Sequence, residues 1–331
     1  MKASFKRFVS LLLVLVMVFA LIACGQDKGL VLNGVDFGEL EYEGISILGV
    51  TYDFYDNGYA FIKAILHENA QIADTVTYED KDYSVAAIGY IAKGTFDRSL
   101  GNSIFDNAYA GIESPENLML PDSIIFISSN ALAFSTALSI TLPKNITHLG
   151  SSVFRGCRNI KTVDFPDALT SITGYSLFSS CDSLEYVTFP EDIKITDLSG
   201  CFTDCYSLKS VIIPGSVETL GSYPFSNCYE LAEVIIGEGI TTFPSLTFSS
   251  CHKLQKFVFP ESVTLIEDMV FHDCPQLEDV TLPDGITDVP AKLFTNEYHQ
   301  AADVSNLTIR VRKDLVDYVQ SIYPEANVVA K

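Results

Sequence analysis

Basic residues are scarce in this chain of 331 residues. Lysine and arginine together number 21, whereas aspartate and glutamate number 42, which gives a formal net charge of −21 at pH 7. Such a protein repels the phosphates of nucleic acids and the head groups of an anionic bilayer, so neither is expected as a partner. The acidity is compatible with a basic or cation-bridged partner, but its plainest interpretation is a well-solvated surface outside the cell.

Recognisable catalytic and metal-binding motifs are also missing. The sequence contains no G-x-S-x-G, H-E-x-x-H or phosphate-binding loop. Its five histidines are scattered, and His252 and His272 do not stand at equivalent positions of any repeat. Cys201 and Cys205 are four positions apart, but no second pair with suitably spaced histidines accompanies them. We therefore expect no enzymatic activity, no cofactor and no metal site.

The apolar run near the N-terminus is short for a membrane span. It covers Phe8–Ala23, about 16 residues, whereas a spanning helix needs about 20. Three basic residues and no acidic ones precede it, which is typical of a signal peptide over residues 1–23 and argues against the alternative, a transmembrane anchor. Because this leader carries three positive charges, its removal changes the net charge from −21 to −24.

The end of the run, Leu21-Ile22-Ala23-Cys24, resembles the bacterial lipobox. The resemblance implies that Cys24 is lipidated and becomes the N-terminus of the mature chain. Acyl chains would then hold the protein on a membrane surface without a spanning helix. We expect an exported, lipid-anchored protein that faces the cell exterior.

A nearly constant interval separates six cysteines. The steps between them are 24, 24, 23, 23 and 23 residues, and the positions are Cys157, Cys181, Cys205, Cys228, Cys251 and Cys274. A phenylalanine precedes each cysteine by three residues, and an aliphatic residue follows three later. The full unit reads F-x-x-C-x-x-L-x-x-V-x-h-P-x-x-I-x-x-I/L. A period of this length predicts a solenoid in which each unit stacks on the next.

Each unit has a readable internal structure. The V-x-h segment alternates with period 2 and predicts a short strand with one face buried. Proline ends that strand, because it cannot donate to a continuing ladder. The I-x-x-I spacing turns another strand or a short helical turn inward, while the phenylalanine and cysteine fill the interior. We expect about eight units over residues 88–311, with an inserted loop over residues 97–117.

Different segments are expected to cap the two ends. Residues 50–87 predict an N-terminal hairpin, with turns at Asp56-Asn57-Gly58 and at residues 79–82, after a lipid-anchored linker over residues 24–49. Leu307, Ile309 and Val311 predict a last strand. Residues 312–331 predict a C-terminal cap with an amphipathic helix over 312–322, whose apolar face consists of Leu315, Val316, Val319 and Ile322.

The unit resembles the BspA-like leucine-rich repeat, L-x-x-V-x-h-P-x-x-I-x-x-I-x-x-x-A-F-x-x-C, over roughly residues 85–311. The resemblance implies a β-rich solenoid with a right-handed coil. It also implies an exported or surface protein that binds other molecules, without specifying the partner. Cys201 departs from the pattern because it lies outside the cysteine ladder, and the units near residues 97–140 are eroded.

The cysteines allow two interpretations. Equivalent residues of adjacent coils lie roughly 4.8 Å apart, which is within the Cα range of a disulfide. With Cys24 lipidated, seven cysteines remain, so at least one is unpaired in a monomer. Stacked side chains point in parallel, and one repeated packing role explains six equivalent positions better. We therefore expect buried thiols, while disulfides between some of them remain the alternative.

Two columns of side chains should point outward from the repeated strands, because the neighbours of each buried valine face the solvent. One column is Ser139, Thr162, Tyr186, Ser210, Glu233, Lys256 and Asp279, and the other is Thr141, Asp164, Thr188, Ile212, Ile235, Val258 and Thr281. Three consecutive members of the second column, Ile212, Ile235 and Val258, are apolar. Exposed contiguous apolar surface often marks a binding site, although β-branched residues also suit any exposed strand.

We therefore hypothesise that this sheet face binds an extracellular protein or glycan, as in adhesion. The candidate partner-binding residues are Tyr186, Thr188, Ile212, Ile235, Lys256 and Val258. Two alternatives stay open. The protein is an envelope scaffold with no dedicated ligand, or it is an accessory to a surface hydrolase.

Overall fold

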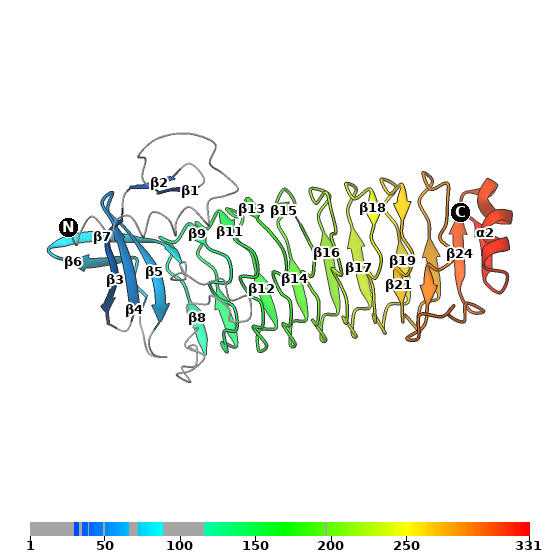
Figure 1. The fold of residues 1–331 in the computed structure, drawn as a ribbon, viewed down its shortest axis with the longest axis horizontal. Helices are drawn as coiled ribbons and strands as arrows, with labels where there is room; N and C mark the ends of the chain where they lie inside the picture. Colours follow the sequence, from blue (N-terminus) through cyan, green and yellow to red (C-terminus); the bar gives the residue numbers. More distant parts are fainter. Residues whose placement is uncertain are drawn as a thin grey trace, which may run out of the picture.

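The computed structural model describes residues 30–32, 35–38, 40–48, 50–65, 72–88, 116–195 and 197–331. This part of the chain is an elongated stack of coils, with a broader sheet at its N-terminal end and a short helix at its C-terminal end (Figure 1). The predicted leader, Cys24 and most of the predicted inserted loop lie outside the described residues. Within the described ranges, no helix is both long and apolar enough to cross a membrane.

The V-x-h segments form the first face of the stack, as predicted. Each coil contributes one short strand, and the strands run parallel with equivalent repeat positions paired. They are β8 (Asn117–Met119), β10 (Ser139–Thr141), β12 (Thr162–Asp164), β14 (Tyr186–Thr188), β16 (Ser210–Ile213), β17 (Glu233–Ile236), β19 (Lys256–Val258), β22 (Asp279–Thr281), β24 (Thr308–Val311) and β25 (Asn327–Ala330). The solenoid therefore has about ten turns rather than about eight. The hydrogen-bonded ladder is interrupted between β10 and β12 and between β17 and β19.

The I-x-x-I segments form a second face made of two-residue strands. These are β9 (Phe126–Ile127), β11 (His148–Leu149), β13 (Ser171–Ile172), β15 (Lys194–Ile195), β18 (Thr242–Phe243) and β20 (Leu265–Ile266). Towards the C-terminal end, two of the ladder phenylalanines begin further short strands, β21 (Phe271–His272) and β23 (Phe294–Thr295). The alternatives that the sequence left open, a strand or a helical turn, are thus resolved as strands in these coils.

The N-terminal sheet continues directly into this second face. Its strands are β3 (Leu40–Ile47), β4 (Val50–Tyr55), β5 (Tyr59–Ile65), β6 (Thr75–Tyr78) and β7 (Lys81–Ile88), and β7 pairs in parallel with β9. The predicted turn between β4 and β5 is present, with Gly58 at a φ of 81°. Strand β3 lies in the segment that the sequence assigns to a linker, and it pairs with β4. A separate pair, β1 (Leu30–Leu32) and β2 (Val35–Gly38), precedes it.

The C-terminal end contains the predicted helix and one additional strand. A 3₁₀ turn, η1 (Lys313–Leu315), leads into α2 (Val316–Ile322), and Val319 is fully buried on its apolar face. The sequence predicts β24 as the last strand, but β25 follows the helix and pairs in parallel with β24. The hydroxyl of Tyr323, between helix and strand, donates to the carbonyl of Pro290 and so ties this segment to the stack.

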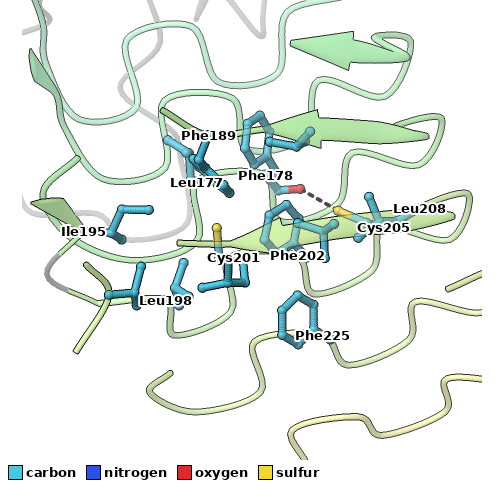
Figure 2. Packing of buried hydrophobic residues seen from close by; sticks show 14 of the residues in the cluster. Leu177, Phe178, Phe189, Ile195, Leu198, Cys201, Phe202, Cys205, Leu208 and Phe225 are labelled. Atoms are coloured by element: carbon cyan, nitrogen blue, oxygen red, sulfur yellow. Dashed lines mark hydrogen bonds between the residues drawn. The ribbon is translucent and has the colours of Figure 1, made fainter. Parts of the chain in front are cut away.

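The core is a column of stacked phenylalanine rings beside a column of thiols, of which Figure 2 shows the rings of Phe178, Phe202 and Phe225 and the ladder thiol of Cys205. Successive ring centroids are 5.3 to 5.6 Å apart from Phe154 through Phe178, Phe202, Phe225, Phe248 and Phe271 to Phe294. Each later ladder thiol donates to the backbone carbonyl of the phenylalanine one coil earlier, at 3.0 to 3.3 Å. Stacked rings and buried thiol donors repeat at the spacing of the coils, which explains the constant period of the sequence.

The prediction of buried thiols is confirmed for most of the ladder. The side chains of Cys157, Cys181, Cys205, Cys228 and Cys251 are fully buried, and burial raises the pKa of these thiols above the ordinary value. Cys201, outside the ladder, is buried as well. Cys274, the last member of the ladder, is only partly buried.

Candidate functional site

The exposed side of the first face brings the predicted second column together in register. Thr188 on β14 pairs with Ile212 on β16, which in turn pairs with Ile235 on β17. The two isoleucines are 56% and 50% exposed, although the residues on either side of them in each strand are buried. Parallel pairing at equivalent positions therefore places two large apolar side chains next to each other in solvent.

Val258 lies one coil further along and is 65% exposed. Strands β17 and β19 are neighbours in the stack, but the hydrogen-bonded ladder is interrupted between them, and β19 pairs with β22 instead. Val258 is thus in register with Thr281. Of the three apolar side chains that were predicted to stack side by side, only Ile212 and Ile235 lie on strands that are paired with each other. We call Ile212, Ile235 and Val258 the apolar patch.

Tyr186 lies on β14 at the N-terminal side of the apolar patch and is 45% exposed. The ammonium of Lys209 stands 5.5 Å from the centre of its ring, a cation–π distance. Lys209 also forms an ion pair with Glu185, whose carboxylate is 3.7 Å from the ammonium of Lys161. The hydrogen bond from Lys209 lowers the pKa of Glu185. Lys209 therefore contacts both the ring of Tyr186 and the carboxylate of Glu185 at the border of the apolar patch.

Charged side chains also border the other end. Lys256 on β19 is in register with Asp279 on β22, and Asp279 accepts a two-pronged ion pair from the guanidinium of Arg310 on β24. The nitrogen–oxygen distances of this pair are 3.1 and 2.9 Å. The six predicted residues thus occupy one side of the sheet, with an apolar centre between charged borders.

A second exposed cluster was not predicted. The rings of Tyr206 and Tyr229 stack at 5.1 Å, and the ring of His252 stacks on Tyr229 at 4.9 Å. The Nε2 atom of His252 lies 3.0 Å from a carboxylate oxygen of Asp273. Each ring belongs to the residue directly after a ladder cysteine. A search for aromatic residues at one repeat position would have found the cluster, whereas the comparison of histidines alone missed it.

Two further histidines of the described residues, His272 and His299, stack on each other. His272 is buried, its Nδ1 lies 3.0 Å from the hydroxyl of Thr295, and its ring stacks on His299 at 4.5 Å. Burial lowers the pKa of His272. Among the residues that the structure describes, no group of three or more histidine, cysteine, aspartate or glutamate side chains is placed to hold a metal ion. The candidate site on the first face thus has apolar side chains at its centre and polar groups around it.

Several solved structures are similar to this chain. The leucine-rich repeat protein TpLRR of T. pallidum has 24% identical residues and a TM-score of 0.50, and the match covers 64% of this chain and 91% of that one. The pneumococcal vaccine antigen PcpA has 15% identity and a TM-score of 0.41, with coverage of 88% and 100%. A leucine-rich cell surface protein of Faecalibacterium prausnitzii has 18% identity and a TM-score of 0.33, with coverage of 86% and 97%. Similarity to TpLRR at this level of identity shows the fold alone.

A comparison with curated proteins found no match. The family described as BspA type leucine rich repeat region matches residues 91–199 and 178–301, with six copies. These ranges cover more than half of the chain and include the coils from β8 to β22. The repeat unit, the stacked strands and this match agree, and the chain belongs to the BspA-type leucine-rich repeat family.

Proposed function

We propose that this protein is a non-catalytic cell-surface protein that recognises an extracellular protein or glycan through the exposed sheet face from β14 to β19. The observation that carries the proposal is the pairing of Ile212 with Ile235, both half exposed on adjacent strands of a strongly acidic chain. Apolar side chains gathered on a solvent-facing sheet are typical of interaction surfaces.

The distribution of charge supports the same proposal. Protein interfaces are depleted of charge at the centre and polar at the rim. Here the centre is the apolar patch, and the charged groups beside it are Glu185 and Lys209 on one side, and Glu233 on β17 and Lys256 on β19. Tyr186 adds an exposed ring beside the patch, and tyrosine is among the side chains enriched at binding interfaces.

Export and lipid anchoring complete the proposal. They are supported by the basic start of the chain, the apolar run before Cys24 and the lipobox-like residues that end it. Metabolic labelling with a palmitate analogue should mark the wild-type protein and not the Cys24→Ala variant. A variant that is still labelled and still found with the membrane would refute this part.

A binding screen tests the recognition itself. The full-length chain in detergent is presented to arrays of matrix proteins, mucins and cell-wall polysaccharides. We expect binding to at least one class, and we expect a variant with Ile212→Thr, Ile235→Thr and Val258→Thr to bind at least tenfold more weakly with an unchanged melting temperature. A matched variant with Leu138→Thr and Leu265→Thr, at residues that are 52% and 51% exposed elsewhere, should bind normally. Equal binding by the patch variant would refute the proposal, and the absence of any binder would favour the scaffold alternative.

A further inference from the structure

A cavity of about 440 Å³ lies near the C-terminal end of the solenoid, between the coil that carries Cys274 and the coil after it. Its apolar walls include Phe271, Leu277 and Phe294, and the thiol of Cys274 also lines it. This volume is within the range of small-ligand sites in proteins. The cavity is separate from the sheet face of the proposed function, and the inference below does not depend on that function.

The cavity exists because the repeat fails in the following coil. Val280 on β22 follows Phe271 by nine positions, but the equivalent Ile309 on β24 follows Phe294 by fifteen positions. The extra residues form a small hairpin, in which Thr295 bridges to Ala301 and the amide of Asn296 donates to the carbonyl of Gln300 at 2.9 Å. The chain therefore leaves the stack at the point where the next cysteine and leucine should cover the preceding coil.

The cysteine and leucine positions of this coil are filled one residue later than the spacing back from Ile309 predicts. The amide of Leu307 donates to the carbonyl of Val304 at 3.0 Å, as the amide of Leu277 does to the carbonyl of Cys274, so Val304 and Leu307 take these positions. Leu307 is buried and Val304 is partly buried, whereas Asp303 and Asn306, one residue before each, are exposed and line the cavity. Next to this displaced segment Cys274 and Leu277 are only partly buried, although their equivalents in the coil before, Cys251 and Leu254, are fully buried.

The charge around the cavity is entirely negative. Asp273, Glu278 and Asp303 line it, and no lysine, arginine or histidine does. The backbone amide of Ser305 donates to Asp303 at 3.0 Å and lowers the pKa of that carboxyl group. Asp273 is engaged by His252, but Glu278 has no hydrogen-bond or ion-pair partner for its carboxylate in the described part of the chain. A concave site lined by one sign of charge concentrates the opposite charge.

We propose that this cavity binds an ammonium or guanidinium group on a short apolar stem, as in a lysine or arginine side chain of a partner protein or in a free alkylamine. The stem would lie against Leu277 and the aromatic walls, and the cation would stand between Glu278 and Asp303. A neutral chain of the same length would lose the attraction of these carboxylates, and an anion would be repelled by them.

A titration followed by NMR tests the proposal on the full-length chain. The probes are Nα-acetyl-lysine-N-methylamide, n-butylammonium and the neutral Nα-acetyl-norleucine-N-methylamide. We expect saturable shifts of the amides of residues 273–278 and 303–307 with a dissociation constant on the order of 1 mM, as suits so small a fragment. Stronger binding of the blocked lysine would assign the site to a protein side chain, and stronger binding of butylammonium to a free amine. Equal binding of the norleucine probe, or shifts that do not saturate, would overturn the proposal.

Three variants separate charge and shape from folding. Glu278→Gln with Asp303→Asn should weaken binding of the cationic probes at least fivefold, whereas Asp167→Asn with Glu191→Gln, at exposed positions on distant coils, should not change it. Asn306→Trp enlarges an exposed side chain of the cavity lining, so it should fill part of the cavity and weaken binding without lowering the melting temperature. If the first variant binds the lysine probe as tightly as the wild type, or if Asn306→Trp keeps the wild-type melting temperature and binds the probe as tightly, the proposal is wrong.

Discussion

The thiol of Cys205 donates a hydrogen bond to the backbone carbonyl oxygen of Phe178 in the preceding coil, with 3.1 Å between sulfur and oxygen (Figure 2). Both residues are fully buried. The same contact recurs along the ladder, so each thiol is a second donor to a buried carbonyl that also accepts the backbone amide three residues later. The cysteine column therefore joins neighbouring coils without covalent bonds.

Removal of one such thiol should destabilise the stack. Cys205→Ala removes one of the two donors to the carbonyl of Phe178, which keeps its bond from the amide of Cys181, and opens a small cavity; together these should cost about 1–3 kcal/mol. Cys274→Ala should cost less, because Cys274 is partly exposed and water can replace its thiol. Thermal unfolding of both variants measures the difference. A lower melting temperature for Cys274→Ala than for Cys205→Ala would contradict this account.

The ladder thiols should be inert in the folded protein. Burial raises the pKa of Cys181, Cys205, Cys228 and Cys251 well above the ordinary value, so almost no thiolate is present at neutral pH. We expect an alkylating reagent to modify Cys274 first and the other four only on the timescale of unfolding. Peptide mass spectrometry after timed labelling gives the order. Rapid labelling of the four buried thiols in folded protein would show that they are accessible.

The ring of Tyr229 lies between those of Tyr206 and His252, so its loss should leave both neighbours unstacked. Tyr229→Ala should destabilise the protein by about 0.5–1.5 kcal/mol per lost ring pair at most, since these rings are partly exposed. Tyr229→Phe keeps the stack and should melt close to the wild-type temperature. Equal destabilisation by the two substitutions would assign the effect to the hydroxyl instead of the ring.

Part of the acid sensitivity of the fold should come from Glu238. Its carboxylate accepts hydrogen bonds from the backbone amides of Glu261 and Ser262 in the next coil, at 3.0 and 2.8 Å, and these bonds lower its pKa from the ordinary 4.5. A carboxyl group with a lowered pKa in the folded state stabilises that state above its unfolded pKa. This stabilisation is lost as the pH falls through 4.5 and below the folded pKa.

The melting temperatures of the wild type and Glu238→Gln test this. They should differ at pH 7 and converge as the pH is lowered below about 4. Glu191 stands at the same repeat position two coils earlier, in the loop after β14, and its carboxylate makes no hydrogen bond within the described residues. Glu191→Gln should therefore differ little from the wild type at any pH. A difference for Glu238→Gln that is constant over pH would argue against a role for its ionisation.

The periodic part of the fold could be predicted from the sequence because each coil repeats the same pattern of buried and exposed residues. A buried valine between two exposed residues predicts a strand such as Thr162–Asp164, and the constant spacing predicts which strands lie side by side. The phase of the cysteines also correctly indicated that Ile212 and Ile235 face the solvent in register.

The remainder depends on contacts that no local pattern contains. Strand β25 has no phenylalanine and cysteine before it, and only its pairing with β24 across the helix makes it a strand. Strand β3 likewise depends on pairing with β4. The break between β17 and β19, which separates Val258 from Ile235, has no signal in the repeat itself. The cavity did have one, since Ile309 follows Phe294 by fifteen positions where the preceding coils have nine, and the extra residues form the hairpin.

The most direct test of sheet-face recognition compares one charge placed at two equally exposed positions. Ile235 and Leu265 are 50% and 51% exposed on short strands of the first and second faces, respectively. Affinity for the molecule identified by the binding screen is measured for Ile235→Lys and for Leu265→Lys in the full-length chain. We expect at least a tenfold loss of affinity for Ile235→Lys and none for Leu265→Lys, with both variants folded. Equal affinities of Ile235→Lys and the wild type would contradict sheet-face recognition.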